Sequence, residues 1–458
     1  MLAQRFAHCI LVLLLCRSFV SAQAPPANAN FTHGQVGEDI AEFVTAYAAE
    51  GFSGVVFAAK GGEVIAAVGV GYADLHRTTP ITPDVLFEIA SVTKSFTAAA
   101  VLELQQRSLL KISDSIAAHL PGIPDNCKAI TIEHVLRHTS GIPGTNSAGA
   151  GDDIDAVLPL FLRGGPRHEP GTHWEYWNQG YSILSEIIAR TVQRPYVDAC
   201  RASLFEPAGM RMTCFTGDAA PLGAVVAIGR GPTGPPRSAL DHPYGAYGFQ
   251  YRGMGGMVTN AWDLWRWDRA LAKDTVLTPA SRDAMFTPGL NNYALGWFVT
   301  TTPTGRAVQH HGGGVRGFSC TVRRYPDDDA FMAVLSNRND APLHQVATGV
   351  EQMMFDEPVT IPPPLRSLDA ATVEAIAGVY RDERGNTLII ELDGDVTRAR
   401  VQWAAGGGRV THGLIGLDAD AKPTFTDRRD RLAFTIERDD AARSHAVSIG
   451  PQRYTREP

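Results

Sequence analysis

Charged residues are scarce in this chain of 458 residues: 19% are Asp, Glu, Lys or Arg, whereas 44% are hydrophobic. This balance excludes a disordered protein and a coiled coil, because both classes are rich in charge. The net charge is −7, and no long basic run occurs. A nucleic-acid binder needs a basic stripe for the phosphates, so we expect no nucleic-acid partner. The length suffices for two or three domains with a large buried core.

Lysine and metal-binding patterns are also rare. Only six of the 41 basic residues are Lys, so a motif that requires a lysine has few chances to arise by accident. No cysteine stands in a CxxC or CxxH pattern, and no H-E-x-x-H motif occurs. These absences exclude the common zinc and redox sites, so we expect no metal.

The apolar run at the N-terminus, residues 9–15, is too short to span a bilayer. Arg5 precedes it and small residues follow at 20–22, as in a secretory signal peptide. We therefore expect residues 1–22 to be removed from a periplasmic or secreted protein with no stable membrane span. Four cysteines then remain, either as isolated thiols or in one of three pairings: Cys127, Cys200, Cys214 and Cys320.

Secondary-structure patterns divide the remaining chain into two domains. After a flexible segment at 23–37, strand patterns at both ends of 38–356 enclose helical ones. This order predicts an α+β domain whose sheet is completed by distant segments. A Pro-rich linker follows at 357–365. Short strands between turn-rich segments at 366–458 predict a small all-β, barrel-like domain.

Apolar periodicity places the elements of both domains. Helical spacing covers 38–50, 132–137, 181–192 and 261–272, and an amphipathic helix is expected from Ser91 to about residue 106. Strand patterns cover 55–59, 64–68, 294–300, 319–325 and 331–335 in the first domain, and 388–392, 399–403, 432–437 and 446–449 in the second.

Ser91 and Lys94 stand where an extended segment, 86–89, gives way to that long helix. At a helix start, side chains three residues apart lie on one face, so the ammonium can reach the hydroxyl. Unpaired N–H groups and the helix dipole favour negative charge there, which turns a serine into a nucleophile. The alternative is that Ser91 caps the helix and Lys94 is a surface charge. Ser108 and Lys111 repeat the spacing at the helix end, where the dipole opposes an alkoxide.

Tyr176 and Asn178 form the single Tyr-x-Asn of the chain, between a Pro-Gly-Thr turn and a helical run. A phenol can shuttle a proton where a neighbouring lysine lowers its pKa. An amide can hold a lysine and a substrate carbonyl together. The alternative is a buried structural tyrosine.

The glycine-rich segment 310–317 contains a G-x-G-x-x-G match but does not open a helix after a strand. A dinucleotide site is therefore excluded, and we expect no cofactor. Glycines that lead into a strand instead let a substrate backbone approach and expose an N–H donor. The chain has no G-x-S-x-G elbow. His134 and His138 have i, i+4 spacing without a carboxylate, which indicates structural histidines.

In this order, Ser91-Val-Thr-Lys94, Tyr176-Trp-Asn178 and His311-Gly-Gly313 resemble the S-x-x-K, Y-x-N and [KH]-[TS]-G elements of penicillin-recognising serine hydrolases. The resemblance is to the branch of class C β-lactamases, DD-peptidases and esterases, and it runs from about residue 38 to 356. It implies a β-lactamase/transpeptidase-like domain, in which helices flank an antiparallel sheet and a further part is all-helical. The tail is similar to the β-barrel domain appended to several such hydrolases.

The resemblance also implies a role for each motif residue. Ser91 would be the nucleophile that forms an acyl-enzyme, with Lys94 and Tyr176 as its proton partners. Which of these two takes the proton stays open. Asn178 would hold Lys94 and the substrate amide. The backbone N–H groups of Ser91 and Gly314 would form the oxyanion hole, beside the substrate-binding residues His311 and Gly313.

Two departures from the family pattern bear on specificity. His311 and Gly312 stand where the lactamase branch has Lys and Thr, which removes a permanent cation and a hydroxyl. At its ordinary pKa near 6.5, His311 would gain a proton toward pH 6 and then hold a substrate carboxylate. Arg316 and Arg252 are candidate replacement cations. Trp177 replaces a small residue and is expected to narrow the cleft.

These features predict an exported, metal-free serine hydrolase that cleaves amide, peptide or ester bonds. A peptidase, amidase or esterase fits the departures better than an efficient β-lactamase. The expected partners are small-molecule or peptide substrates, with cell-wall D-amino-acid peptides and β-lactams as candidates. The alternative is a weak or inactive penicillin-binding-like protein that binds cell-wall peptides.

Overall fold

The computed structural model describes residues 29–144, 153–231, 234–243, 251, 253–359, 366–393, 396–402, 410–418, 420–427, 431–438 and 444–457. The expected signal peptide and most of the expected linker lie outside these residues. In the part that is described, no helix is both long and apolar enough to cross a membrane. The four cysteines expected to remain are all free and buried.

A seven-stranded sheet lies at the centre of the first domain, in the order β1-β3-β2-β12-β11-β10-β9. Each pair of neighbours is antiparallel, and Val56 lies opposite Val334. Segments from both ends of the domain therefore complete one sheet, which confirms the prediction. The strands are β1 (Phe31–Thr32), β2 (Gly54–Lys60), β3 (Glu63–Val70), β9 (Phe298–Thr301), β10 (Ala307–Val315), β11 (Phe318–Tyr325) and β12 (Ala330–Ser336).

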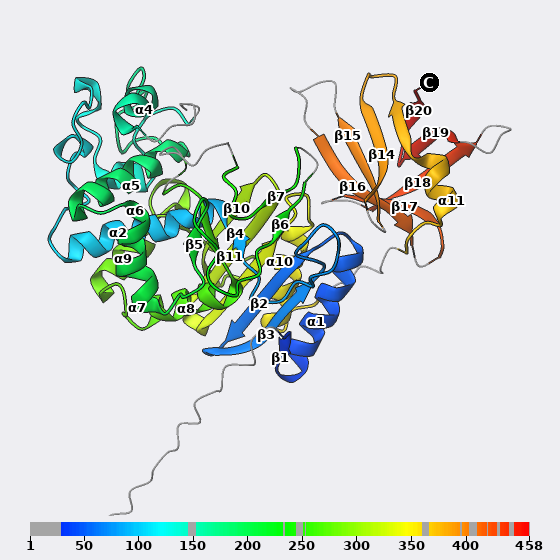
Figure 1. Cartoon of the computed structure of the whole chain (residues 1–458), viewed down its shortest axis with the longest axis horizontal. Helices are drawn as coiled ribbons and strands as arrows, with labels where there is room; N and C mark the ends of the chain where they lie inside the picture. Colours follow the sequence, from blue (N-terminus) through cyan, green and yellow to red (C-terminus); the bar gives the residue numbers. More distant parts are fainter. Residues whose placement is uncertain are drawn as a thin grey trace, which may run out of the picture.

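Strand alternation distributes apolar side chains to the two faces of the sheet. On β2, Val55 and Phe57 belong to one hydrophobic core, whereas Val56 and Ala58 belong to another. The second core is closed by α1 (Gly34–Ala49) and α10 (Leu343–Met354) (Figure 1). The first core is closed by the helices between β3 and β9.

Those helices form the all-helical part and pack around α2 (Thr93–Gln106). The amphipathic helix expected there is instead buried on nearly all sides, since only Glu103, Gln105 and Gln106 of α2 are not buried. The other helices are α3 (Ile132–Leu136), α4 (Ile154–Phe161), α5 (Asn178–Val192), α6 (Tyr196–Cys200), α7 (Glu206–Ala208), α8 (Ala261–Ala272) and α9 (Pro279–Phe286). Short strands accompany them: β4 (Phe87–Glu88), β5 (Cys214–Phe215), β6 (Ile228–Gly229), β7 (Arg237–Ser238) and β8 (Met257–Thr259).

The second domain is a closed antiparallel barrel, drawn in orange and red in Figure 1. Its last strand pairs with its first, at Tyr380 and Arg456, so no strand edge is left open. Its own core includes Ile376 of α11 (Ala370–Ile376), Tyr380 and Phe434. The strands are β13 (Gly378–Arg381), β14 (Thr387–Asp393), β15 (Val396–Gln402), β16 (Val410–Leu417), β17 (Pro423–Asp427), β18 (Arg431–Arg438), β19 (Ser444–Ile449) and β20 (Gln452–Arg456). The predicted fold class, an α+β domain followed by a barrel-like domain, is confirmed.

One further expectation about the first domain was wrong, and one of its central strands was not predicted. The flexible segment was expected to extend to residue 37, but Phe31 pairs with Ala67 of the sheet, and α1 already begins at Gly34. Phe31 also packs against the first core, which fixes this segment. Strand β10 was not predicted, because three consecutive glycines weaken its strand signal. Its pairing with β9 and β11 supplies what the local sequence lacks.

The separate core of the barrel predicts how a shortened chain behaves. A chain ending at Pro364 should fold, and its main thermal transition should lie within about 3 °C of the corresponding transition of the full chain. The reason is that the barrel's core residues all come from the part after the linker. Differential scanning calorimetry measures both transitions. Loss of the main transition would show that the larger domain needs the barrel to fold.

Candidate active site

Ser91 lies in a single 3-10 turn, η1 (Ala90–Val92), which runs directly into α2. No side-chain cap hydrogen bond is made at the start of either helix, so the capping alternative for Ser91 is wrong. The preceding residue, Ala90, has φ of 44°, in the left-handed region that non-glycine residues rarely adopt. Such a residue costs about 1–3 kcal/mol and is typical of functional turns. The strained turn leaves Ser91 half-buried at the start of the helix.

Lys94 is completely buried beneath Ser91. Its Nζ donates to Ser91 Oγ at 3.1 Å and to the Met254 carbonyl oxygen at 2.8 Å. Burial lowers the pKa of Lys94 well below its ordinary value, because the charged form loses its hydration. The surface-charge alternative is therefore wrong. Sequence reasoning missed Met254, because a backbone carbonyl leaves no residue-type signal.

Tyr176 completes the cluster around the serine oxygen. Burial raises its pKa well above the ordinary value, although the neighbouring Ser91 side chain opposes the shift. The Tyr176 ring also lies against the lysine, with Nζ of Lys94 4.9 Å from the ring centroid. The structure thus brings together the three residues predicted as catalytic, and burial moves the pKa values of Lys94 and Tyr176 in opposite directions.

Asn178 is the first residue of α5 and is half-buried. The predicted contact of its amide with Lys94 stays a prediction. Trp177, however, is fully buried in the first core instead of lining the cleft, so the expectation that it narrows the cleft was wrong. Its backbone N–H donates to Nδ1 of His138 at 3.1 Å.

His138 is a buried support of Tyr176 that sequence reasoning took only for a structural histidine. The residue is 1% exposed, and its ring packs on the Tyr176 ring, with centroids 4.2 Å apart. Burial lowers its pKa well below the ordinary value, so the ring is neutral and its Nδ1 accepts from Trp177. His134 has the structural role that was predicted, because its Nδ1 accepts from the backbone N–H of Thr131 in a capping box.

His311 lies on β10 with only 3% of its surface exposed. Nδ1 donates to the Gly312 carbonyl oxygen at 2.6 Å, so Nε2 of the neutral ring accepts from the Tyr293 hydroxyl at 3.2 Å. Burial, helped by nearby Lys94, lowers the pKa of His311 to about 3. The expectation that His311 gains a proton near pH 6 and holds a carboxylate was therefore wrong. The loss of hydration on burial, which the sequence does not show, is the main cause of the lowered pKa of His311.

Strand β10 packs against the turn that carries Ser91. A Cβ at Gly313 would lie 2.2 Å from the Ile89 carbonyl oxygen and 2.7 Å from Sγ of Cys320. Only glycine therefore permits this close approach. Gly314 follows on the same strand with no atom within 4 Å of its Cβ position. Its role as an oxyanion donor, together with the N–H of Ser91, stays a prediction.

A buried carboxylate, Glu88 on β4, braces the segment before the nucleophile. It accepts from Nη2 of Arg237 and from the Tyr251 hydroxyl. Burial raises the pKa of Glu88, although Arg237 opposes the shift. Arg237 also donates to the Arg316 carbonyl oxygen at 2.9 Å and so ties β4 to the β10–β11 turn. Sequence reasoning missed this cluster.

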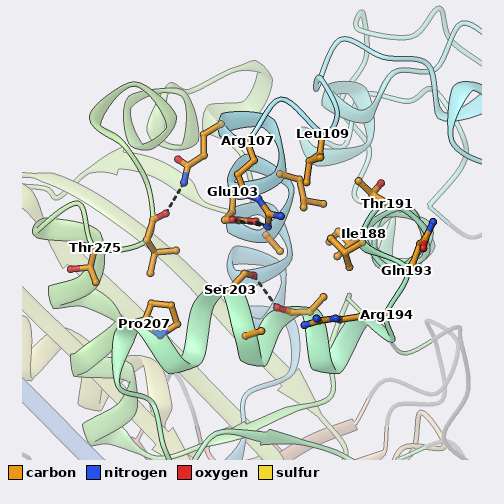
Figure 2. Close-up of a pocket in the computed structure, with 17 residues that line it drawn as sticks. Glu103, Arg107, Leu109, Ile188, Thr191, Gln193, Arg194, Ser203, Pro207 and Thr275 are labelled. Carbon is orange, nitrogen blue, oxygen red and sulfur yellow. Dashed lines mark hydrogen bonds and ion pairs between the residues drawn. The ribbon is translucent and has the colours of Figure 1, made fainter.

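The second serine–lysine pair lies far from this chemistry. Ser108 lies two residues beyond Gln106, the last residue of α2, has φ of 59° and is exposed, as expected for a helix end. A cavity of about 730 Å³ lies at this end of α2 (Figure 2). The hydroxyls of Thr191 and Ser203 in its wall donate to backbone carbonyls, and Arg107 pairs with Glu103. These hydroxyls are engaged in helix contacts, so the cavity offers no activated serine of the Ser91 kind.

The first domain is a sheet with helices on both faces, and its Ser–Lys–Tyr cluster lies beside strand β10. This combination of fold and site defines the β-lactamase/transpeptidase-type serine hydrolases. Residues 39–351 match the Beta-lactamase family, and the chain belongs to that family. Penicillin-binding protein 4* of Bacillus subtilis (strain 168) is 29% identical over 378 residues, which cover 75% of this chain and 82% of that protein.

Two solved structures share the fold. The octameric penicillin-binding protein homologue from Pyrococcus abyssi has a TM-score of 0.61 and 20% identity, covering 92% of this chain and 99% of that one. The D-amino acid amidase from Ochrobactrum anthropi SV3 has a TM-score of 0.61 and 22% identity, covering 70% of this chain and 99% of that one. The larger coverage in the first case extends the likeness beyond the α+β domain.

The lowered pKa of His311 predicts a pH-dependent loss of stability. Between about pH 3 and 6.5 the unfolded chain binds a proton at this residue and the folded chain does not, so stability falls as the pH is lowered through that window. From pH 7 to pH 5 this residue alone should remove roughly 2 kcal/mol. Urea unfolding at both pH values measures the loss. His311→Gln should show a loss smaller by that amount, and an equal loss in both proteins would contradict the assignment.

Proposed function

We propose that this protein is an exported serine hydrolase that cleaves amide, peptide or ester bonds through an acyl-enzyme on Ser91. The observation that supports this most is the buried Lys94 amine 3.1 Å from Ser91 Oγ. Its hydrogen bonds go to a hydroxyl and a carbonyl, whereas a buried lysine with a structural role is normally paired with a carboxylate. A protein that only binds cell-wall peptides gains nothing from an activated serine.

The pKa shifts favour Lys94 as the base in acylation. Burial lowers the lysine pKa, so the neutral amine is available to accept the proton of Ser91 Oγ. As the Oγ–carbon bond forms, the carbonyl oxygen becomes negative and accepts from the N–H groups of Ser91 and Gly314. Tyr176 keeps its proton because its pKa is raised. It gives that proton to the leaving group as the scissile bond breaks, and Lys94 returns a proton to Tyr176.

Water then attacks the acyl-enzyme, and the same groups act in reverse to release the acid and restore Ser91. No step needs a metal. On the substrate side, His311 is neutral throughout the working pH range, so β10 presents no cation from this position. We infer that substrates without a carboxylate beside the scissile bond, such as amino-acid amides and esters, are preferred to β-lactams, and that this preference does not change toward pH 6.

A covalent label tests the nucleophile. Incubation with a fluorophosphonate or a penicillin, followed by peptide mass mapping, should place the adduct on Ser91 in the full chain. The chain ending at Pro364 should give the same adduct, because Ser91, Lys94 and Tyr176 all precede the linker. Ser91→Ala should lower kcat/KM by at least about 10³-fold while stability stays within about 1 kcal/mol. Ser108→Ala is the matched control and should label normally. An adduct on Ser108 would refute the assignment.

Substitution of Lys94 distinguishes a role as general base from a role as a fixed positive charge. Activity of the wild type should fall as the pH drops through the lowered pKa of Lys94, because only the neutral amine accepts a proton. The arginine of Lys94→Arg stays protonated at every working pH and cannot accept the proton of Ser91, so kcat should drop by about 10³-fold at every pH. The control, Lys128→Arg, changes an exposed lysine that pairs with Asp125. Retention of a tenth of the activity in Lys94→Arg would show that Lys94 acts only through its charge.

A further inference from the structure

Two of the three consecutive glycines on β10 have no structural reason to be glycine. The nearest atom to a Cβ built at Gly312 is 3.7 Å away, and none lies within 4 Å of one at Gly314. Neither residue has a positive φ. Glycine inside a strand weakens it, because it adds backbone entropy and packs nothing. These two positions therefore differ from Gly313, where packing demands glycine.

The space above these two glycines opens into a cavity of about 560 Å³. Side chains alternate along a strand, so Gly312 and Gly314 face away from the Ile89 contact of Gly313. They lie opposite Thr321 and Ser319 on β11, which also line the cavity. The C-terminal part of β10 is thus shared between the Ser91 turn on one face and this cavity on the other.

The cavity wall carries polar groups but little uncompensated charge. Its arginine, Arg323, is ion-paired with Glu351 at 2.6 Å, and both side chains are largely buried. Thr321 and Asn339 supply uncharged polar surface, and His344 stands at the start of α10. A charged group entering the cavity would lose its hydration without meeting a free opposite charge among these residues, whereas an uncharged group loses less.

We propose that this cavity receives the leaving group of the substrate, and that Gly312 and Gly314 are glycines to admit it. The proposal rests on the proposed function, because the Gly314 N–H is there a donor to the scissile carbonyl. The acyl carbon is bonded to Ser91 on one face of β10. The leaving group, on the other side of the scissile bond, extends past Gly314 into the cavity on the other face. The leaving group is bulky and uncharged, such as an arylamine or aryl alcohol. It departs as the carbon–nitrogen or carbon–oxygen bond breaks and takes its proton from Tyr176.

Substitutions that fill the cavity from β10 and from β11 test the leaving-group proposal. Gly312→Thr and Thr321→Leu each add side-chain volume without touching the catalytic cluster. Each should lower kcat/KM at least tenfold for a D-phenylalanine 4-nitroanilide or naphthylamide and less than twofold for D-phenylalanine amide. The control, Thr301→Leu, makes a comparable change on β9 outside the cavity. Gly312→Thr should also raise the melting temperature by about 2 °C, since threonine suits a strand better than glycine.

The outcomes separate this proposal from the one it rests on. Equal losses for large and small leaving groups, or losses that follow the acyl group when the leaving group is constant, would overturn the leaving-group assignment alone. In that case Ser91 would still be acylated in the wild type. Failure of the wild type to form an acyl-enzyme with any of these substrates would overturn both proposals.

Discussion

The active site depends on burying one amine beneath one hydroxyl. Lys94 has lost its hydration completely, and its Nζ meets Ser91 Oγ and a backbone carbonyl. Desolvation at this position favours the uncharged form, which lowers the pKa of Lys94 and makes the neutral amine accessible. The surroundings serve that burial, because α2 lies in the middle of the helical part instead of on its surface.

Close backbone approach is the second requirement. Gly313 lets β10 touch the segment before Ser91, and the Glu88–Arg237 pair ties that segment to the β10–β11 turn. The same crowding desolvates His311 and lowers its pKa, so the residue that replaces a family lysine is a neutral hydrogen-bonded spacer. Catalytic geometry and the absence of a cation on this strand thus have one common cause, tight packing around the nucleophile.

Much of the fold could be read from local patterns. Alternation predicted β2, β3, β11 and β12, and helical spacing predicted α1, α3, α5 and α8. Strand β10 was missed because its pairing partners, and not its glycine-rich sequence, make it a strand. Half of the barrel strands, β13, β16, β17 and β20, were also missed, because their pairing with neighbouring strands in the closed barrel, and not a local pattern, makes them strands.

The sequence by itself determined which chemical groups the site contains: the spacing of Ser91 and Lys94, the single Tyr-x-Asn and the glycines of β10. Tertiary structure alone decided their states. Whether Lys94 and His311 carry charge, whether Trp177 lines the cleft, and which glycines are required by packing all depend on which atoms surround them. The physical reason is that the ionisation of the site residues and the steric fit of the glycines are set by neighbouring residues in space. Those neighbours include Ile89, Met254 and Tyr293, which no local sequence pattern brings together.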